Sequence, residues 1–227
     1  MLKNFLHKRR SITAQTSILI TLTIAVALVI SALLFYYKTD KELTTHYREQ
    51  MFQESNTTMN VLSDNIDTID SIYRLLVSSD TIYSFMASSS RTPSDYIATE
   101  KQMTSLLILN NLWEKSYLES VYVYTNYNKR FYVSKNDNMI KREENAAVYR
   151  NLTEPSPTLT LHALDGSDDL YFVRTIYNLS SGDVLGTMIV TLNQKSWVNM
   201  LTQNISKGWH ILIYNNSFET ISDYNYD

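Results

Sequence analysis

The segment DLYFVRTIYNLSSGDVLGTMIVTLN, residues 169–193, carries the strongest fold signal in this sequence. Residues 170–177 and 184–192 are rich in β-branched and aromatic residues, the composition of well-packed strands. The six residues between them, NLSSGD, hold Gly182 near their end, as is common in hairpin connections. The segment therefore predicts an antiparallel β-hairpin, and the rest of the predicted domain is arranged around it.

Segments on both sides of this hairpin predict further strands and short helices. The predicted strands are Ser120–Thr125, Arg130–Ser134 and Thr158–Ala163, and another strand begins at His210. The predicted short helices are Ser94–Glu114, a stretch near Asn145–Asn151, and Ser196–Gln203. Helices followed by an antiparallel sheet of about five strands indicate an α+β fold, with helices layered on a sheet.

A long helix is predicted before this domain, from about residue 39 to residue 77. Apolar residues recur there at helical steps: Leu43, Tyr47, Met51, Met59, Leu62, Ile66, Ile69, Tyr73 and Leu76. Neither Gly nor Pro interrupts residues 38–92, and Thr92-Pro93 provides the next helix start. The long helix can pack on its own domain, line a partner helix for part of its length, or do both.

An uninterrupted apolar run, Ser17–Tyr37, precedes the long helix and follows Lys3, Lys8, Arg9 and Arg10. About 20 uncharged residues suffice for a helix to cross roughly 30 Å of hydrocarbon. The basic tail predicts that residues 1–16 stay in the cytoplasm and that the body lies outside the cell. A cleaved signal peptide is the alternative, but its apolar core would be shorter, at about 7 to 15 residues.

Composition excludes several functional classes. After the basic tail, 16 basic residues face 23 acidic ones, so we expect no nucleic acid partner. The sequence has no cysteine, which excludes disulfides, thiol chemistry and Cys-ligated zinc. The four histidines are widely separated, and the adjacent carboxylates Glu143-Glu144 and Asp168-Asp169 read as solvated loop charges. We therefore expect no catalytic residues, no metal site and no cofactor.

The order of these segments resembles a known family. The basic tail, apolar helix and long exported helix are followed by Val121-Tyr-Val-Tyr, Phe131-Tyr-Val-Ser and the 169–193 hairpin with its Leu-Gly and Leu-Asn positions. This arrangement resembles the extracellular double-Cache sensor region of bacterial membrane histidine kinases, of the type paired with AraC-family response regulators. The resemblance covers essentially the whole chain. It implies a PAS-like Cache domain.

The resemblance implies a domain organisation. We expect a cytoplasmic tail (1–16), a transmembrane helix (17–37), a long exported helix (38–80), a membrane-distal Cache domain (81–203) and the start of an incomplete membrane-proximal subdomain (204–227). We also expect 204–227 to be the least ordered exported segment. The kinase domains of the family are not in the sequence, so the chain reads as truncated before a second membrane helix.

The resemblance also implies a function and partners. The chain would be the sensory region of a two-component histidine kinase, binding an unidentified small molecule, dimerising through the long helix and reaching a response regulator only through the missing cytoplasmic domains. Two alternatives stay open. The same outer region also serves membrane-bound AraC-type transcription regulators and chemoreceptors, and a membrane-anchored scaffold would need no ligand.

Candidate ligand-binding residues are the aromatic side chains around the predicted sheet and one charge within it. They are Trp113, Tyr117, Tyr122, Tyr124, Tyr132, Tyr149 and Arg174. Aromatic walls with a few polar groups are typical of small-molecule sites. Arg174 is the single charge in the predicted strand and must meet a carboxylate, from a ligand or from the protein. Strand alternation places Tyr122 and Tyr124 on one face. The alternative is that the tyrosines are ordinary core and that Arg174 projects from an edge.

Overall fold

In a computed structural model, the chain is described at residues 2–127, 129–152, 154–203, 205, 209–214 and 220–226. For residues 2–15, 209–211, 213 and 220–226 only the backbone is described. The chain divides into two compact units, residues 1–53 and 54–227. The segment 204–227, expected to be the least ordered, includes residues that lie outside those described.

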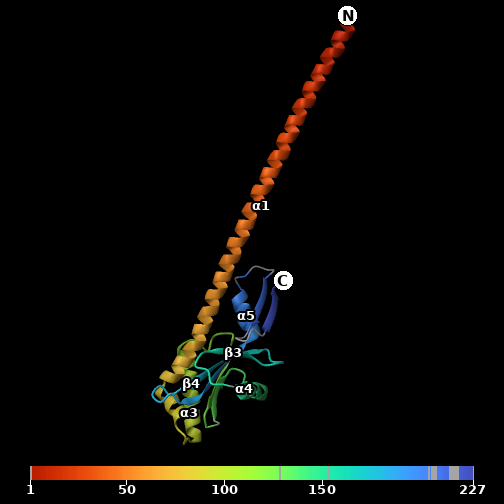
Figure 1. Cartoon of the computed structure of the whole chain (residues 1–227). Helices are drawn as coiled ribbons and strands as arrows, with labels where there is room; N and C mark the ends of the chain where they lie inside the picture. The colour runs from red at the N-terminus through yellow and green to blue at the C-terminus, as the bar shows by residue number, and fades with distance from the viewer. Residues whose placement is uncertain are drawn as a thin grey trace. The chain divides into compact units, whose positions relative to one another are not determined.

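The secondary structure confirms the predicted α+β class, with a long apolar N-terminal helix, four shorter helices and a five-stranded antiparallel sheet (Figure 1). The helices are α1 (Leu2–Ser78), α2 (Asp80–Ala87), α3 (Pro93–Leu109), α4 (Met139–Asn151) and α5 (Gln194–Thr202). The sheet strands are β1 (Leu118–Thr125), β2 (Arg130–Ser134), β3 (Thr160–Ala163), β4 (Asp169–Tyr177) and β5 (Val184–Asn193). A separate hairpin pairs β6 (Trp209–Tyr214) with β7 (Thr220–Tyr226).

The helix α1 contains the apolar run of the first unit. Its side chains between residues 18 and 37 are exposed, and from residue 16 the helix is long and apolar enough to cross a membrane. In the second unit, the last turns of α1 bury Ile69, Ile72 and Leu76 in the domain core. The predicted packing of the long helix on its own domain is therefore present at its C-terminal end.

Local capping explains where the shorter helices differ from the sequence prediction. The helix α3 begins at Pro93 as expected, after Thr92, but ends at Leu109 and not at Glu114. Asn111 adopts a positive φ of 55°, and the Leu112 N–H bonds back to the carbonyl of Leu107 at 2.9 Å, which turns the chain out of the helix. The extended conformation of Ser79 likewise separates α2 from α1.

The five strands follow the order β2-β1-β5-β4-β3, and every neighbouring pair is antiparallel. One side, the apolar face, packs on α1, α2, α3 and α5. It consists of Val121, Val123, Phe131, Val133, Leu170, Phe172, Ile176, Met188, Val190 and Leu192. The other side, the α4 face, lies against α4 (Figure 1). The predicted hairpin 169–193 forms the β4–β5 pair, with the turn 178–183.

Gly186 has a steric role in this sheet. A Cβ atom there would lie 3.2 Å from the Cα of Thr125 and in collision with the backbone oxygen of Tyr124. Side chains essentially never approach a backbone so closely, so any residue larger than Gly would push β5 away from β1. The Leu-Gly position of the sequence pattern thus lies where a Cβ on β5 would collide with the backbone of β1.

Candidate functional site

The α4 face of the sheet carries far more polar and aromatic groups than the apolar face. Strand alternation and the antiparallel register bring them to one side: Tyr122, Tyr124, Tyr132, Asp169, Tyr171, Val173, Thr175, Thr187, Ile189 and Thr191. Most of these side chains are buried. A buried layer with so many hydrogen-bonding groups is unusual for a purely structural core.

Four of the predicted site residues stack in a single column on this face. Tyr132 lies parallel to Tyr122 with ring centroids 4.9 Å apart, and Tyr122 lies parallel to Tyr124 at 6.3 Å. Tyr149, from α4, continues the column at 4.4 Å from Tyr124. The predicted common face of Tyr122 and Tyr124 is present, and the β1–β2 register places Tyr132 beside Tyr122.

The hydroxyl groups of this tyrosine column differ in their partners. Those of Tyr122 and Tyr124 are buried. The Tyr122 hydroxyl has no hydrogen-bond partner among the described residues, whereas Arg130 is a partner of the Tyr124 hydroxyl. Burial raises the pKa of both phenols, so they stay protonated donors. At the outer end, the Tyr132 hydroxyl donates to Asp137 at 3.0 Å, and the guanidinium of Arg142 stands 5.2 Å from the ring centroid.

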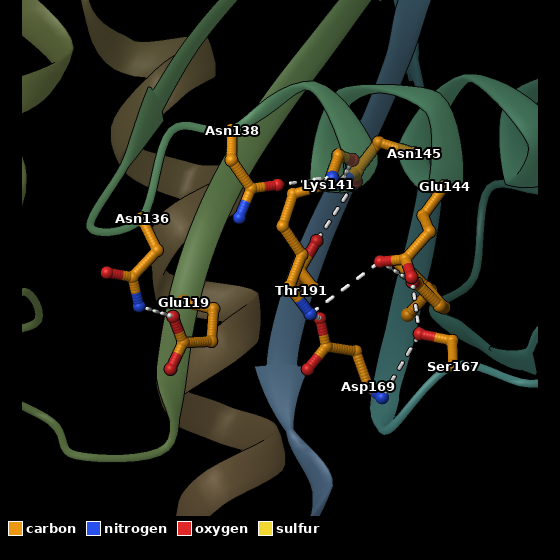
Figure 2. A network of polar contacts seen from close by, with 10 residues as sticks. Glu119, Asn136, Asn138, Lys141, Glu144, Asn145, Ser167, Asp169 and Thr191 are labelled. Atoms are coloured by element: carbon orange, nitrogen blue, oxygen red, sulfur yellow. Dashed lines mark hydrogen bonds and ion pairs between the residues drawn. The ribbon is translucent and has the colours of Figure 1, made fainter.

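An ionic network lies at the other end of the same face, beneath the N-terminal half of α4 (Figure 2). The Lys141 ammonium pairs with Asp169 and lies 3.6 Å from Glu144. Glu144 accepts a hydrogen bond of 3.1 Å from the Tyr171 hydroxyl, whose oxygen also lies 2.9 Å from the Ser167 hydroxyl. Two carboxylates therefore share one ammonium.

Capping and one buried side-chain contact hold α4 over the network. The side chain of Asn138 caps the helix by accepting the Lys141 backbone N–H at 2.8 Å. One turn later, the buried Asn145 accepts a hydrogen bond of 2.9 Å from the hydroxyl of Thr191 on β5. These two contacts set the position at which Lys141 meets Asp169. The sequence predicted only the end of this helix, near Asn145–Asn151, and missed its start.

Asp169 is the most buried charged group of the network. Its side chain is 1% exposed, and its Oδ1 atom has no hydrogen-bond partner among the described residues. Burial raises the pKa of Asp169, and the ammonium of Lys141 opposes this effect. Burial acts to lower the pKa of Lys141, but the hydrogen bond and charge of Asp169 outweigh it and the pKa is raised. The pair is ionic yet leaves one carboxylate oxygen unsatisfied.

A cavity of about 360 Å³ opens at the C-terminal end of α4. Tyr149, Thr175 and Thr187 contribute to its wall, so it adjoins the end of the tyrosine column. Arg150 and Glu154 bring one charge of each sign to the same cavity. A volume of this size lies within the range of small-molecule pockets.

The remaining predicted site residues lie on the other side of the sheet. Tyr117 is buried in the apolar core, and Trp113 packs against the same core with the Lys135 ammonium 5.6 Å from its ring centroid. Arg174 points to α1, where it pairs with Asp70 and stands 3.8 Å from the ring centroid of Tyr73. The carboxylate expected to meet Arg174 is therefore one from the protein.

Sequence reasoning missed the ionic network. It treated Asp168-Asp169 and Glu143-Glu144 as solvated loop charges, yet Asp169 is the first residue of β4 and is buried, and the Glu144 side chain is 17% exposed. A carboxylate directly before an apolar strand was the available signal for Asp169. Among the described residues, no group of three or more His, Asp or Glu side chains could hold a metal ion.

No protein-family model matches the chain, and no curated protein sequence matches it. Among solved structures, it is similar to the sensory domain of the Campylobacter jejuni chemoreceptor Tlp3 with isoleucine bound, at 15% identity and a TM-score of 0.46. That match covers 74% of this chain, which spans 66% of the other. The same ligand-binding domain with 4-methylisoleucine matches at 16% identity, with a TM-score of 0.46 and the same coverage. Likeness at this level carries no argument about function.

Proposed function

We propose that this chain is the extracytoplasmic ligand-sensing region of a membrane receptor, with the ligand bound on the α4 face of the sheet. The observation that carries the proposal is the composition of that face. A column of four tyrosines, in which the buried Tyr122 hydroxyl is unpaired among the described residues, ends at a cavity of about 360 Å³. Unpaired buried donors are unfavourable unless something binds them, and a ligand that enters beneath α4 provides the missing partners.

The seven candidate residues take three roles in this proposal. Tyr122, Tyr124, Tyr132 and Tyr149 form the aromatic wall of the ligand site. Arg174 acts in transmission, because it lies on the opposite side of β4 and pairs with α1. Trp113 and Tyr117 support the apolar core and touch no ligand.

The strand β4 connects the ligand site with α1. Its Thr175 lines the cavity, while the adjacent Arg174 holds Asp70 of α1 and stacks on Tyr73. A ligand that shifts β4 therefore moves an ion pair anchored on the helix. Because α1 also contains the apolar run, such a shift can reach the membrane through one continuous helix. The ligand determines the direction in which β4 shifts, because it stabilises the conformation of β4 that it binds more tightly.

The membrane arrangement belongs to the proposal. The apolar part of α1 crosses the bilayer, the basic tail remains in the cytoplasm and the second unit lies outside. Because the chain contains no cysteine, single-cysteine variants report topology without background. We expect a membrane-impermeant maleimide to label Ser180→Cys on intact cells and Ser11→Cys only after permeabilisation. Labelling of Ser11→Cys alone on intact cells would reverse the topology, and labelling of neither would place the body inside.

We further propose that the cytoplasmic output is a histidine kinase acting on a response regulator, and that the receptor is a homodimer. The residue pattern of 169–193 supports the first point, through its resemblance to kinase sensor regions. Exposed apolar residues on α1, including Leu43, Tyr47 and Met51, support the second. The coding sequence beyond codon 227 tests the output directly: a phosphoacceptor helix with ATP motifs supports it, and methylation helices or a helix-turn-helix contradict it.

The ligand site is tested with the full chain in detergent micelles and a panel of amino acids, amines, purines and organic acids. We expect one class to raise the melting temperature (Tm) saturably in the wild type. Thr187→Val removes a hydroxyl from the cavity wall with little change of volume and should weaken that response. Leu179→Ala, at an 81% exposed turn position, is the matched control and should respond like the wild type. If no compound acts, the scaffold alternative gains support.

A further inference from the structure

The structure contains a second cavity, on the apolar side of the sheet and away from the proposed ligand site. It has a volume of about 320 Å³ and lies between α2 and the start of α3. Hydroxyl-bearing residues from both helices and from the segment that joins them line it: Thr81, Ser84, Ser88, Ser90 and Thr99. Arg91 and Asp95 supply its charges, and Phe85 supplies its apolar floor.

Arg91 is the unusual residue of this cavity. Its Nε, Nη1 and Nη2 atoms are all buried, and Tyr96 is a hydrogen-bond partner of the guanidinium. A guanidinium carries five N–H donors, and burying them without acceptors is strongly unfavourable. Two aromatic rings also contact it: the guanidinium carbon stands 4.2 Å from the ring centroid of Phe85 and 5.7 Å from that of Tyr127.

The nearby carboxylate does not neutralise Arg91. Asp95 makes no salt bridge with it among the described residues. Its Oδ2 atom accepts the Thr92 backbone N–H at 2.6 Å as part of the α3 cap. Burial lowers the pKa of Arg91, while Tyr96, Tyr127 and Asp95 act in the opposite direction. The guanidinium is therefore a cation with buried nitrogen atoms, and Tyr96 uses only part of its hydrogen-bonding capacity.

We propose that the α2–α3 cavity binds a small-molecule oxyanion, a phosphate, sulfate or carboxylate group, with Arg91 as its charged partner. Planar guanidinium groups match such anions with paired hydrogen bonds. The surrounding hydroxyls extend the site. Ser84 and Ser88 now donate to the backbone carbonyls of Thr81 and Ser90, at 3.2 and 2.9 Å, and can rotate toward an anion.

This site is independent of the ligand site on the α4 face. Phe85 packs edge-on against Phe131 of the apolar face at 5.2 Å between ring centroids, so an anion at Arg91 acts on the core that joins α2, α3 and β2. Occupancy would stiffen the α2–α3 junction. An anion bound here would be a second ligand of the same domain, and it would act through the apolar side of the sheet.

Calorimetric titration of the full chain in detergent micelles tests the proposal, with sodium phosphate, sodium sulfate and sodium acetate as separate probes at constant ionic strength. We expect at least one probe to bind saturably and to raise the Tm by about 2 to 5 °C. Arg91→Gln should weaken that binding by about tenfold or more. Arg48→Gln, which removes the same charge from an exposed position on α1, should bind like the wild type.

A second variant covers the case in which Arg91→Gln does not fold. Ser84→Glu places a carboxylate in the cavity, so it should raise the Tm without added anion and abolish binding of the probe. Thr187→Val, in the other cavity, should leave anion binding unchanged, which separates the two sites. Absence of binding by all three anions, or equal binding by the wild type and Ser84→Glu, would show that Arg91 is only a structural partner of Phe85 and would overturn the proposal.

Discussion

The two faces of the sheet belong to the same five strands but differ in composition: one is mostly apolar, and the other is rich in tyrosines and buried polar residues. On the apolar face, residues such as Val121, Phe131 and Met188 are fully buried and make only apolar contacts with the helices. On the α4 face, the neighbouring residues of the same strands are tyrosines, threonines and Asp169, several with unpaired polar atoms. Alternation along each strand makes this separation possible.

The difference indicates a division of labour within one domain. Apolar burial supplies most of the favourable free energy of folding, so the apolar face together with α1, α2 and α3 stabilises the domain. Buried polar residues are concentrated on the α4 face, and those with an unpaired atom there, such as Tyr122 and Asp169, reduce stability. Such groups are retained where they have another partner, and a ligand is the partner proposed here.

The largest effect is expected from a truncation on the apolar face. Phe131→Ala removes a fully buried ring and should lower the free energy of unfolding by about 3–5 kcal/mol. Tyr122 lies on the α4 face of β1, one residue before Val123, the residue that pairs with Phe131. Tyr122→Phe removes an unpaired hydroxyl and should leave the free energy of unfolding unchanged or raise it by up to about 1 kcal/mol. Urea unfolding of the full chain, followed by circular dichroism, measures both. A loss of several kcal/mol in Tyr122→Phe would show that this hydroxyl has a structural partner.

The next largest effect tests the ionic network that fixes α4. Lys141→Met leaves the buried carboxylate of Asp169 without its cation and should lower the free energy of unfolding by about 3 kcal/mol. The double variant with Asp169→Leu should recover most of that loss, because no unpaired charge is then buried. Lys101→Met, at an exposed position on α3, is the control and should stay within about 0.5 kcal/mol of the wild type.

If the double variant is no more stable than Lys141→Met alone, the network holds α4 by contacts other than the ion pair. In that case Asn145, through its buried hydrogen bond to Thr191, would be the principal anchor of α4. The unfolding midpoint of Asn145→Ala would then separate the two explanations. If Asn145→Ala lowers the unfolding midpoint more than Lys141→Met does, Asn145 is the principal anchor of α4.

A smaller effect is expected at the junction of β4 with α1. Asp70 is bound by two arginines, Arg174 from β4 and the 68% exposed Arg74 on the next turn of α1. Arg174→Met should lower the free energy of unfolding by about 1–2 kcal/mol, because the half-buried pair and the contact with Tyr73 are both lost. Arg74→Met should change it by less than about 0.5 kcal/mol. Equal losses in the two variants would remove the basis for transmission through β4.

Local sequence closely predicted the β4–β5 hairpin and the C-terminal end of α1. The strands β4 and β5 begin and end within one residue of the predicted positions, because their β-branched and aromatic composition contrasts with a polar turn. The predicted end of the long helix, residue 77, likewise lies next to the observed end at Ser78. In both cases the signal lies in neighbouring residues.

Contacts between distant segments could not be predicted in the same way. The burial of Asp169 depends on Lys141, 28 residues earlier, and the contact between Tyr124 and Tyr149 depends on α4 lying across the sheet. The partner of Arg174 is 104 residues away on α1. The chemical type of that partner, a carboxylate, followed from the unfavourable burial of a lone charge, but its identity required the fold.

The smallest expected effect is a pH dependence that only the α4 side of the sheet should show. His162 on β3 pairs with Tyr171 in the register, and burial lowers its pKa. A histidine that must stay neutral when folded contributes stability above its unfolded pKa of about 6.5, and that contribution is lost as the pH falls through the lower, folded pKa. His162→Gln should therefore flatten the decline of the unfolding midpoint between about pH 6.5 and pH 5. His46→Gln, exposed on α1, should keep the wild-type slope. Among the described residues, the ring bonds to Thr160 at 3.0 Å and no carboxylate pairs with it to offset its charging. An unchanged slope in His162→Gln would mean that the ring is solvated when folded.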